Sequence, residues 1–175
     1  MNTSVFWCTG LSGSGKSTLA NGVINKLAKY GKTSLIIDGD EVRERYPAKL
    51  GYGRIDVERN NLNVAKYCFD GIGHYDCIIV PIISPIDEIR KKIRMLFPDF
   101  YLIYVYSDIQ TLRRRDTKGL YEKADSGELK DLIGYSVSNP YDTPDDYDLI
   151  INTSNDSDKT QSINLFLDFI LDSTA

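Results

Sequence analysis

The residues best suited to chemistry stand near the start of the chain, in the run Gly10-Leu11-Ser12-Gly13-Ser14-Gly15-Lys16-Ser17. Its spacing, G-x-x-x-x-G-K-S, is typical of loops that cradle phosphate groups with backbone N–H groups. In such a loop the lysine reaches the β- and γ-phosphates of a nucleotide, and the hydroxyl of Ser17 ligates Mg²⁺. The alternative interpretation is an ordinary glycine-rich turn. The pattern therefore predicts a nucleotide-phosphate site with Gly13, Ser14, Gly15, Lys16, Ser17 and Thr18 as its members.

The stretches on either side of this loop have the patterns that such chemistry requires. Residues 4–9 are rich in β-branched and aromatic residues, which predicts a buried strand. Residues 18–28 have apolar side chains at helical spacing. A helix that begins directly after the loop adds the positive field of its N-terminus to the inward-turned N–H groups. This order of strand, loop and helix favours a phosphate site over a simple turn.

Two carboxylates, Asp38 and Asp40, follow the next predicted strand at residues 33–37. Ligands of open α/β sheets bind at the carboxyl ends of the strands, so these side chains are expected beside the phosphate loop. There they can hold Mg²⁺ or accept a proton from an attacking hydroxyl. The alternative is a turn that caps a helix, because Asp-Gly-Asp is good turn chemistry. The basic run at 41–59 is either a solvated face or, at Arg43 above all, a clamp for an anionic acceptor.

The rest of the chain alternates predicted strands with predicted helices. Nearly continuous apolar runs predict strands at 76–83, 101–106 and 149–151. Helices are predicted at 57–69, at 86–96 with Pro85 in the first turn, at 109–115, and from a cap at Ser157 or Asp158 to about Leu171. Residues 116–147 lack clear periodicity and are interpreted as a mobile lid. We expect a single α/β domain over residues 1–175, with a five-stranded parallel sheet and helices on both faces.

Composition and charge narrow the class of protein. With 175 residues, 26% of them charged, the chain is expected to form one soluble domain. A net charge of −4 argues against a surface that coats nucleic acid, and no apolar run approaches the roughly 18 residues of a membrane span. His74 is the only histidine and sits in a Gly-Ile-Gly-His-Tyr turn, so there is little material for histidine metal sites or histidine-based triads. Cys8, Cys68 and Cys77 are expected to be reduced, mostly buried thiols of a cytoplasmic protein without a signal peptide.

Several motifs together resemble the adenylylsulfate kinases, a family that phosphorylates the 3′-hydroxyl of adenosine 5′-phosphosulfate with MgATP. Besides the phosphate loop, the matching runs are Asp38-Gly39-Asp40-Glu41-Val42-Arg43, Leu50-Gly51-Tyr52, Ile83-Ser84-Pro85 with Arg90, Arg115-Asp116-Thr117-Lys118-Gly119-Leu120-Tyr121, and Pro140-Tyr141-Asp142. The Asp-Gly-Asp and lid motifs are far more specific than the phosphate loop. The resemblance implies a P-loop kinase fold, a Mg²⁺-dependent ATP site and a small nucleotide acceptor. Family members are often dimers, so a homodimer is expected as well.

The resemblance also implies roles for individual residues. Asp40 is expected to be the general base and, with Ser17, a Mg²⁺-site residue, while Lys16 and Lys118 neutralise charge on the transferred group. Tyr52 takes the place of a phenylalanine that stacks on the acceptor base. The further ATP ligands implied are Arg114 or Arg115, and Thr153 near the adenine. The acceptor ligands implied are Asp38, Arg43, Tyr52, Asn60, Ile83, Ser84, Lys118 and Leu120.

The acceptor side departs from the family pattern, whereas the ATP side is intact. Where the family has Asp-Arg-x-Glu-Asn, this chain has Asp56-Val57-Glu58-Arg59-Asn60, so an arginine that binds the acceptor's anion is replaced by Val57. Glu41 replaces a usual asparagine, and Leu132-Ile133-Gly134 stands where the family has Phe-Thr-Gly. Loss of a fixed cation costs about 1–3 kcal/mol of acceptor binding, which favours an acceptor with a different 5′ group or base.

These departures resemble the cytidine diphosphoramidate kinases of capsule phosphoramidate biosynthesis, which look like short adenylylsulfate kinases. Cytidine diphosphoramidate is thus the expected acceptor, with ATP and Mg²⁺, and no nucleic-acid polymer or membrane partner is expected. One alternative is a genuine adenylylsulfate kinase in which Arg54 or Arg59 replaces the missing arginine. Two others are a non-catalytic nucleotide-binding regulatory module and a small-metabolite kinase, of which the latter leaves the lid motif unexplained.

Overall fold

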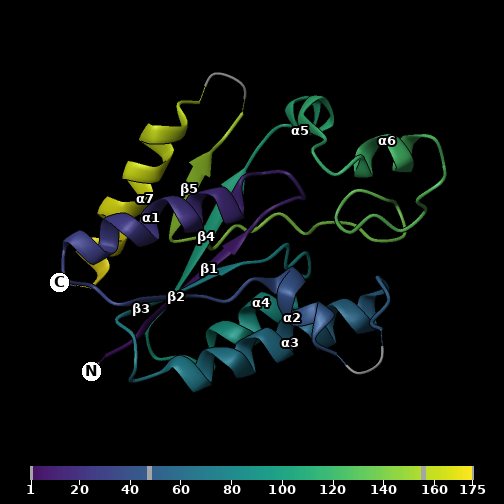
Figure 1. Ribbon diagram of the computed structural model, residues 1–175. Coiled ribbons are helices and arrows are strands. Elements are labelled where there is room, and N and C mark those ends of the chain that lie inside the picture. Colours follow the sequence, from purple (N-terminus) through teal and green to yellow (C-terminus); the bar gives the residue numbers. More distant parts are fainter. Residues whose placement is uncertain (1, 47–48, 155–156, 175) are drawn as a thin grey trace.

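The sheet predicted from the apolar runs is present in the computed structural model, which describes residues 2–46, 49–154 and 157–174 (Figure 1). All its strand pairs are parallel, in the spatial order β2-β3-β1-β4-β5. The strands are β1 (Ser4–Thr9), β2 (Ser34–Ile36), β3 (Cys77–Pro81), β4 (Phe100–Tyr106) and β5 (Leu149–Asn152). The helices are α1 (Lys16–Lys29), α2 (Gly39–Glu44), α3 (Arg54–Gly71), α4 (Asp87–Arg94), α5 (Ile109–Arg115), α6 (Leu120–Asp125) and α7 (Lys159–Ser173).

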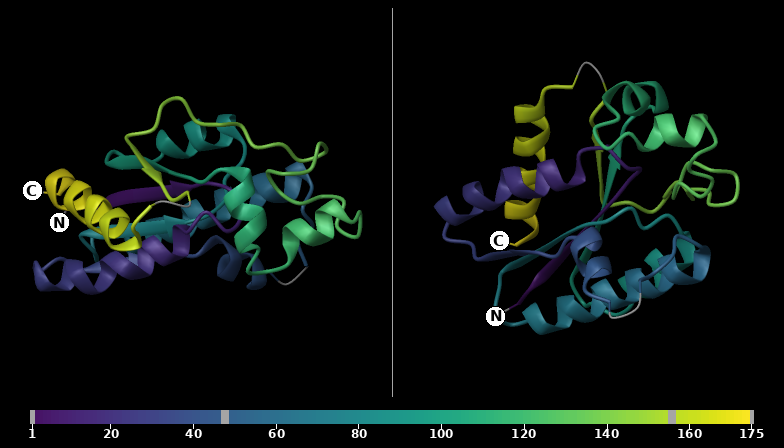
Figure 2. Two further views of the ribbon diagram at one scale, coloured as in Figure 1. Left: turned by 90° about the horizontal axis from the view of Figure 1, so that it is seen from above. Right: turned by 45° about the vertical axis from the view of Figure 1, so that its right-hand side comes forward.

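Helices cover both faces of the sheet, so the central strand is buried throughout. Successive side chains of a strand point to opposite faces. Val5 and Trp7 accordingly pack in the core on the side of α3 and α4, while Phe6 and Cys8 pack on the side of α1 and α7. Both views of Figure 2 show α1 beside α7, and its right-hand view shows α3 on the other side of the sheet. This burial on two faces explains why the sequence shows apolar runs instead of alternation.

The carboxyl ends of the parallel strands meet at one edge of the sheet, and the chemistry-bearing loops follow them. The phosphate loop leaves β1, Asp38 follows β2, and Ser84 follows β3. α5, α6 and the following loops lie beyond the same edge (Figure 1). Within the fully described segment 116–147, α6 is the one helix, and it packs on α5 through a small apolar cluster that includes Leu112, Tyr121 and Leu132.

Several boundaries differ from those expected. α2 and α6 are additional short helices, α3 begins at Arg54, and β3 ends at Pro81. Pro85 is not in the first turn of α4, because Ile86 holds the N-cap position. At α7 the choice between two caps falls on Asp158, whose carboxylate accepts from the backbone N–H groups of Thr160 and Gln161. Apart from the two additional helices, these differences lie at the ends of helices and strands, where the boundaries are least sharply defined by the sequence.

The prediction that the three cysteines are buried, unpaired thiols is confirmed. Cys8, Cys68 and Cys77 are free and buried, and burial raises the pKa of each thiol to about 12. Among the described residues, no helix combines the length and the apolar character that crossing a membrane requires.

Candidate active site

The loop between β1 and α1 has the geometry that its motif predicts. Gly10 passes so close to β4 that a Cβ there would clash with the carbonyl oxygen of Val105. Gly15 has a φ of 94°, a left-handed conformation that residues with side chains rarely adopt, and α1 begins at the next residue. Glycines at these two positions therefore allow the loop to present its N–H groups together with the N-terminus of α1.

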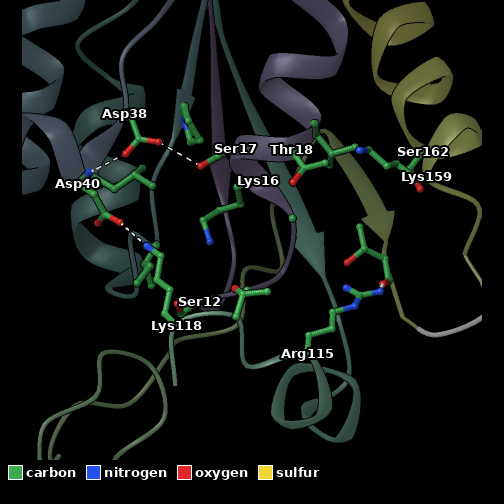
Figure 3. A pocket seen from close by; sticks show the side chains of 18 of the residues that line it. Ser12, Lys16, Ser17, Thr18, Asp38, Asp40, Arg115, Lys118, Lys159 and Ser162 are labelled. Atoms are coloured by element: carbon green, nitrogen blue, oxygen red, sulfur yellow. Dashed lines mark hydrogen bonds and ion pairs between the residues drawn. The ribbon is translucent and has the colours of Figure 1, made fainter. Parts of the chain in front are cut away.

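Lys16 is folded back onto this loop. Its Nζ donates to the carbonyl oxygens of Gly10 and Leu11, both at 2.8 Å. The residue is 8% exposed, and this burial lowers the pKa of Lys16 from 10.5 to about 8, while the nearby Asp40 carboxylate acts in the opposite direction. Figure 3 shows the ammonium end directed into the pocket. A polyphosphate that displaces the two carbonyl contacts would therefore meet a fixed cation.

Two cavities open at this edge of the sheet and share a wall. The phosphate-loop cavity, of about 470 Å³, contains Gly13, Gly15, Lys16, Ser17 and Thr18 in its lining. The second cavity, of about 640 Å³, extends between α2, α3 and the segment 116–147. The residues common to both linings are Ser12, Asp40, Ile82, Ile83 and Lys118. A molecule in one cavity can therefore meet a molecule in the other at Asp40 and Lys118.

Asp40 and Lys118 face each other across the boundary of the two cavities (Figure 3). Lys118 Nζ donates to Asp40 Oδ2 at 3.0 Å. The same contact raises the pKa of Lys118, since the carboxylate stabilises the ammonium form. Asp40 lies in the first turn of α2 and Lys118 between α5 and α6, so the fold brings together two residues for which the resemblance predicts proton acceptance and charge neutralisation.

Asp38 lies between the phosphate loop and α2. Its Oδ2 accepts from Ser17 Oγ at 3.1 Å, and its Oδ1 accepts from the backbone N–H of Asp40 at 2.8 Å, which caps α2. Asp38 lines the phosphate-loop cavity and is absent from the described lining of the second cavity. A role of Asp38 in binding the acceptor stays a prediction, since one of its oxygens contacts the phosphate loop at Ser17 and the other caps α2.

The structure distinguishes the two arginines proposed for ATP. Arg115 lines the phosphate-loop cavity and donates to the carbonyl oxygen of Thr153 at 2.6 Å. Arg114 is exposed and lines neither of the two cavities formed by the described residues. Thr153 also lines the phosphate-loop cavity, and its hydroxyl donates to the carbonyl oxygen of Ser14 at 2.8 Å. Ser14 is fully buried within the loop, whereas Arg115 and Thr153 line the cavity beside it.

The second cavity gathers most of the residues expected to bind the acceptor. Arg43 donates to the carbonyl oxygen of Gly51 at 2.6 Å, and its guanidinium lies 5.2 Å from the centre of the Tyr52 ring. The cation–π contact keeps this arginine and this aromatic face together at the cavity wall. The other expected residues in the lining are Asn60, Ile83, Ser84, Lys118 and Leu120.

A buried arginine fixes the wall near Ser84. Arg90 is 1% exposed and donates to the carbonyl oxygen of Ser84 at 2.7 Å and to that of Asp142 at 2.6 Å. Ser84 has a φ of 46°, which a residue with a side chain adopts only when its surroundings hold it. Arg90 therefore ties the loop after β3 to the segment that returns from the lid.

Several polar residues that line or adjoin the cavities were not predicted from the sequence. Lys159 and Ser162 of α7 line the phosphate-loop cavity, although the sequence indicated only a helix start there. Asn139 donates to the carbonyl oxygen of Tyr52 at 2.6 Å and so connects the lid to the second cavity. Asn61 is buried in α3 and lines the same cavity. For Asn61 a signal existed, since an asparagine on a buried helix face is unusual.

The donor set beside the phosphate loop fits Mg²⁺. Ser17 offers a hydroxyl and Asp38 and Asp40 offer carboxylates, all of them hard oxygen ligands in the lining of one cavity. Magnesium in kinases is held by one or two carboxylates together with substrate phosphates, so a closed cage is not required. In the part of the chain that is described, no group of three or more histidine, cysteine or acidic side chains is arranged to hold a metal ion by itself. Ser17 with Asp40 or Asp38 would hold the ion.

Comparison with known proteins decides the family. A profile described as adenylylsulphate kinase matches residues 2–152. The chain belongs to the adenylylsulphate kinase family. Adenylyl-sulfate kinase of Clostridium kluyveri is 36% identical over 170 residues, which are 97% of this chain and 84% of that protein. Probable adenylyl-sulfate kinase of Bacillus subtilis is 41% identical over 158 residues, with 87% and 77% covered.

A solved member of the family supports the same assignment. The APS kinase CysC of Mycobacterium tuberculosis, in complex with AMPPNP and APS, aligns with a TM-score of 0.85 and 31% identity over 98% of each chain. The predicted P-loop kinase fold is thereby confirmed. Like its family, the chain is an ATP-dependent kinase that transfers phosphate to a hydroxyl group of a nucleotide.

Proposed function

We propose that this kinase phosphorylates the ribose 3′-hydroxyl of cytidine diphosphoramidate, a step of capsule phosphoramidate biosynthesis. ATP occupies the phosphate-loop cavity and the acceptor occupies the second cavity. The shared wall at Asp40 and Lys118 supports this arrangement, because it lets the hydroxyl of one molecule approach the γ-phosphate of the other. In this proposal residues 116–147 form a lid over the acceptor, and residues 1–175 form a single kinase domain.

In the proposed reaction, Asp40 accepts the proton of the 3′-hydroxyl as its oxygen bonds to the γ-phosphorus. The bond from that phosphorus to the bridging oxygen breaks, and ADP leaves. Lys16 and Lys118 neutralise the charge on the transferred group. When bound beside Ser17, Mg²⁺ supplies charge neutralisation at the β- and γ-phosphates. Arg43 and Tyr52 hold the acceptor in the second cavity.

One observation carries the choice of acceptor. Val57, 1% exposed, lines the second cavity at the position where the resemblance places an anion-binding arginine. Neither neighbouring arginine replaces it: Arg54 pairs with Glu88 at 3.3 Å, Arg59 pairs with Asp56 at 3.6 Å, and neither belongs to the lining that the described residues form. In a genuine adenylylsulfate kinase, Arg54 or Arg59 would have to take the place of the missing arginine. The contacts of these two side chains on α3 do not support such a replacement.

Adenylylsulfate is the second candidate acceptor, and the names of the relatives favour it. The relatives from C. kluyveri and B. subtilis are named adenylyl-sulfate kinase and probable adenylyl-sulfate kinase, and the M. tuberculosis structure contains APS. In addition, Arg43, Lys49 and Lys118 supply positive charge to the second cavity. These cations can bind either acceptor, because both carry anionic 5′ groups.

The deciding experiment is ADP release with MgATP and each acceptor at equal concentration. We expect a higher kcat/KM for cytidine diphosphoramidate than for adenylylsulfate. The opposite preference would make the change at position 57 neutral and assign the chain to sulfate activation. Turnover with neither acceptor, together with tight ATP binding, would reject both acceptors and point to another hydroxyl compound.

A further inference from the structure

Tyr121 joins the segment 116–147 to the phosphate loop. Its hydroxyl donates to the carbonyl oxygen of Ser12 at 2.6 Å. Among the described residues, this is the one hydrogen bond between that segment and residues 10–17. Tyr121 is 3% exposed and is absent from the described linings of both cavities, whereas Ser12 belongs to both linings. Tyr121 therefore holds a residue of the shared wall without lining either cavity itself.

The turn that carries Lys118 is closed on the same tyrosine. The carboxylate of Asp116 accepts from the backbone N–H of Tyr121 at 3.1 Å and from that of Glu122 at 2.9 Å, so it bridges the turn. The carbonyl oxygen of Asp116 also accepts from the N–H of Gly119 at 2.8 Å. These three hydrogen bonds fix the backbone of Lys118 relative to Tyr121. A contact that anchors Tyr121 therefore anchors the backbone of Lys118 as well.

The ion pair of Lys118 is too exposed to set the position of this lysine. Its Nζ lies 3.0 Å from Asp40 Oδ2, but the two side chains are 62% and 68% exposed. Ion pairs in such surroundings contribute little free energy, because water screens them and two long side chains must be ordered. The place of the ammonium at the shared wall thus depends on the backbone from which the lysine extends. The hydrogen bond from Tyr121 to Ser12 holds that backbone on the phosphate loop.

A second tyrosine of the same cluster offers a matched comparison. The Tyr121 ring packs in the apolar cluster with Leu112 and Leu132, and it meets the Tyr135 ring edge-on with the centroids 5.1 Å apart. The hydroxyl of Tyr135 donates to Asp125 Oδ1 at 2.7 Å, at the end of α6. Both rings thus pack together, but one hydroxyl holds the phosphate loop and the other holds α6. Replacement of either residue by phenylalanine removes one hydroxyl and keeps the ring.

We infer that Tyr121 is a positioning residue for phosphoryl transfer. Its hydroxyl holds the turn of Lys118 against the phosphate loop, so that the ammonium meets the transferred phosphoryl group at the shared wall. The inference rests on the proposed function, in which Lys118 neutralises charge on that group. Because Tyr121 acts through Lys118, removal of its hydroxyl lowers kcat and leaves the KM for ATP nearly unchanged.

The test is a double-mutant cycle of Tyr121→Phe and Lys118→Met. ADP release is measured at saturating MgATP with cytidine diphosphoramidate and with adenylylsulfate, and the acceptor that the wild type uses faster is kept. We expect Tyr121→Phe to lower kcat by about tenfold in the wild type, as the loss of one hydrogen bond does, and by less than about twofold in Lys118→Met. The control Tyr135→Phe is expected to keep the kcat of each parent.

Hydrogen exchange followed by mass spectrometry gives a readout that does not depend on turnover. In Tyr121→Phe we expect faster amide exchange within residues 116–122, where the N–H groups of the turn lie, because the anchor on the phosphate loop is lost. Tyr135→Phe is expected to leave the exchange of these residues unchanged. Thermal melts establish that each variant is folded.

The outcomes separate the inference from the function on which it rests. Turnover of neither acceptor rejects the proposed function, and full kcat in Lys118→Met rejects the role of Lys118 in it; the inference falls with either. A slow Lys118→Met beside a Tyr121→Phe with the wild-type kcat overturns the inference alone, as does unchanged exchange in residues 116–122 of Tyr121→Phe. An equal loss of kcat from Tyr121→Phe in both backgrounds also overturns it, because Tyr121 would then act independently of Lys118.

Discussion

Lys118 and Asp40 stand 78 residues apart in the chain, yet their side chains form an ion pair at the boundary of the two cavities. The lysine side chain is 62% exposed and the aspartate side chain 68%. Ion pairs this exposed contribute at most about 1 kcal/mol, so little free energy holds the lysine on the carboxylate. We therefore expect Lys118 to leave Asp40 for the transferred phosphoryl group of the proposed reaction, which would free the carboxylate for the incoming hydroxyl.

Replacing Asp40 by asparagine removes the proposed proton acceptor while preserving size. We expect kcat to fall by about 10²–10⁴-fold, with ATP affinity largely retained, because the amide cannot take the proton of the hydroxyl. Single-turnover rates and calorimetric ATP binding measure the two effects. The neighbouring Glu41→Gln, an exposed acid outside the described cavity linings, is the control with expected wild-type turnover. Unchanged turnover in Asp40→Asn would remove Asp40 as the base.

Lys118→Met tests the charge that the lid delivers. The melting temperature is expected to stay the same, since the exposed pair contributes little to folding, while kcat falls by about 10²-fold through loss of charge neutralisation. Lys123→Met is a matched control, because Lys123 is also a lid lysine and pairs with Glu128 at 3.6 Å outside the described linings of both cavities. An equal loss of kcat in both variants would show that general lid charge, not Lys118, is responsible.

The two adjacent arginines at the end of α5 should differ sharply. Arg115→Ala is expected to raise the KM for ATP by about tenfold, because a charge-assisted contact beside the nucleotide is lost. Arg114→Ala should change it by less than about twofold, as surface changes usually do. Initial rates at varied ATP concentration measure both. The reverse order would mean that the lid rearranges around the nucleotide.

ATP affinity should weaken as pH rises through about 8. The pKa of Lys16 is lowered to about 8 by burial, so the ammonium that attracts phosphate is neutralised well below 10.5. At pH 9 we expect about tenfold weaker binding than at pH 7, and Lys16→Met should show no such step. The same shift destabilises the fold fully below about pH 8, a penalty relieved toward pH 10.5 because the unfolded chain then binds more protons. Calorimetric titrations at each pH provide the check.

Val57→Arg should restore the missing cation at the second cavity. We expect kcat/KM for adenylylsulfate to rise by about tenfold relative to cytidine diphosphoramidate, since the guanidinium matches a sulfate or phosphate terminus. Val57→Met is the control, because it adds length without charge. A similar gain for both variants would indicate that cavity shape, and not charge, sets the preference.

Features that depend on neighbouring residues were predictable from the sequence. The phosphate loop, the strand and helix that flank it, and the turn at Gly31 with its positive φ of 72° follow from residue types within a few positions. The five parallel strands followed from apolar runs because helices cover both faces of the sheet. The resemblance singled out Asp40 and Lys118 as well, and the fold places these two side chains within hydrogen-bonding distance.

Features that depend on distant packing had to come from the tertiary structure. Arg114 and Arg115 are adjacent in sequence, and only the position of α5 on the fold turns Arg115 toward Thr153. Asp38 lies on the phosphate side because Ser17, 21 residues away, meets its carboxylate. Asn61 donates to the carbonyl oxygen of Val57 because α3 buries this amide against its own backbone. Local patterns in the sequence thus encode the phosphate loop, because its geometry depends on residues within a few positions, while long-range packing places the other side chains at one cavity or the other.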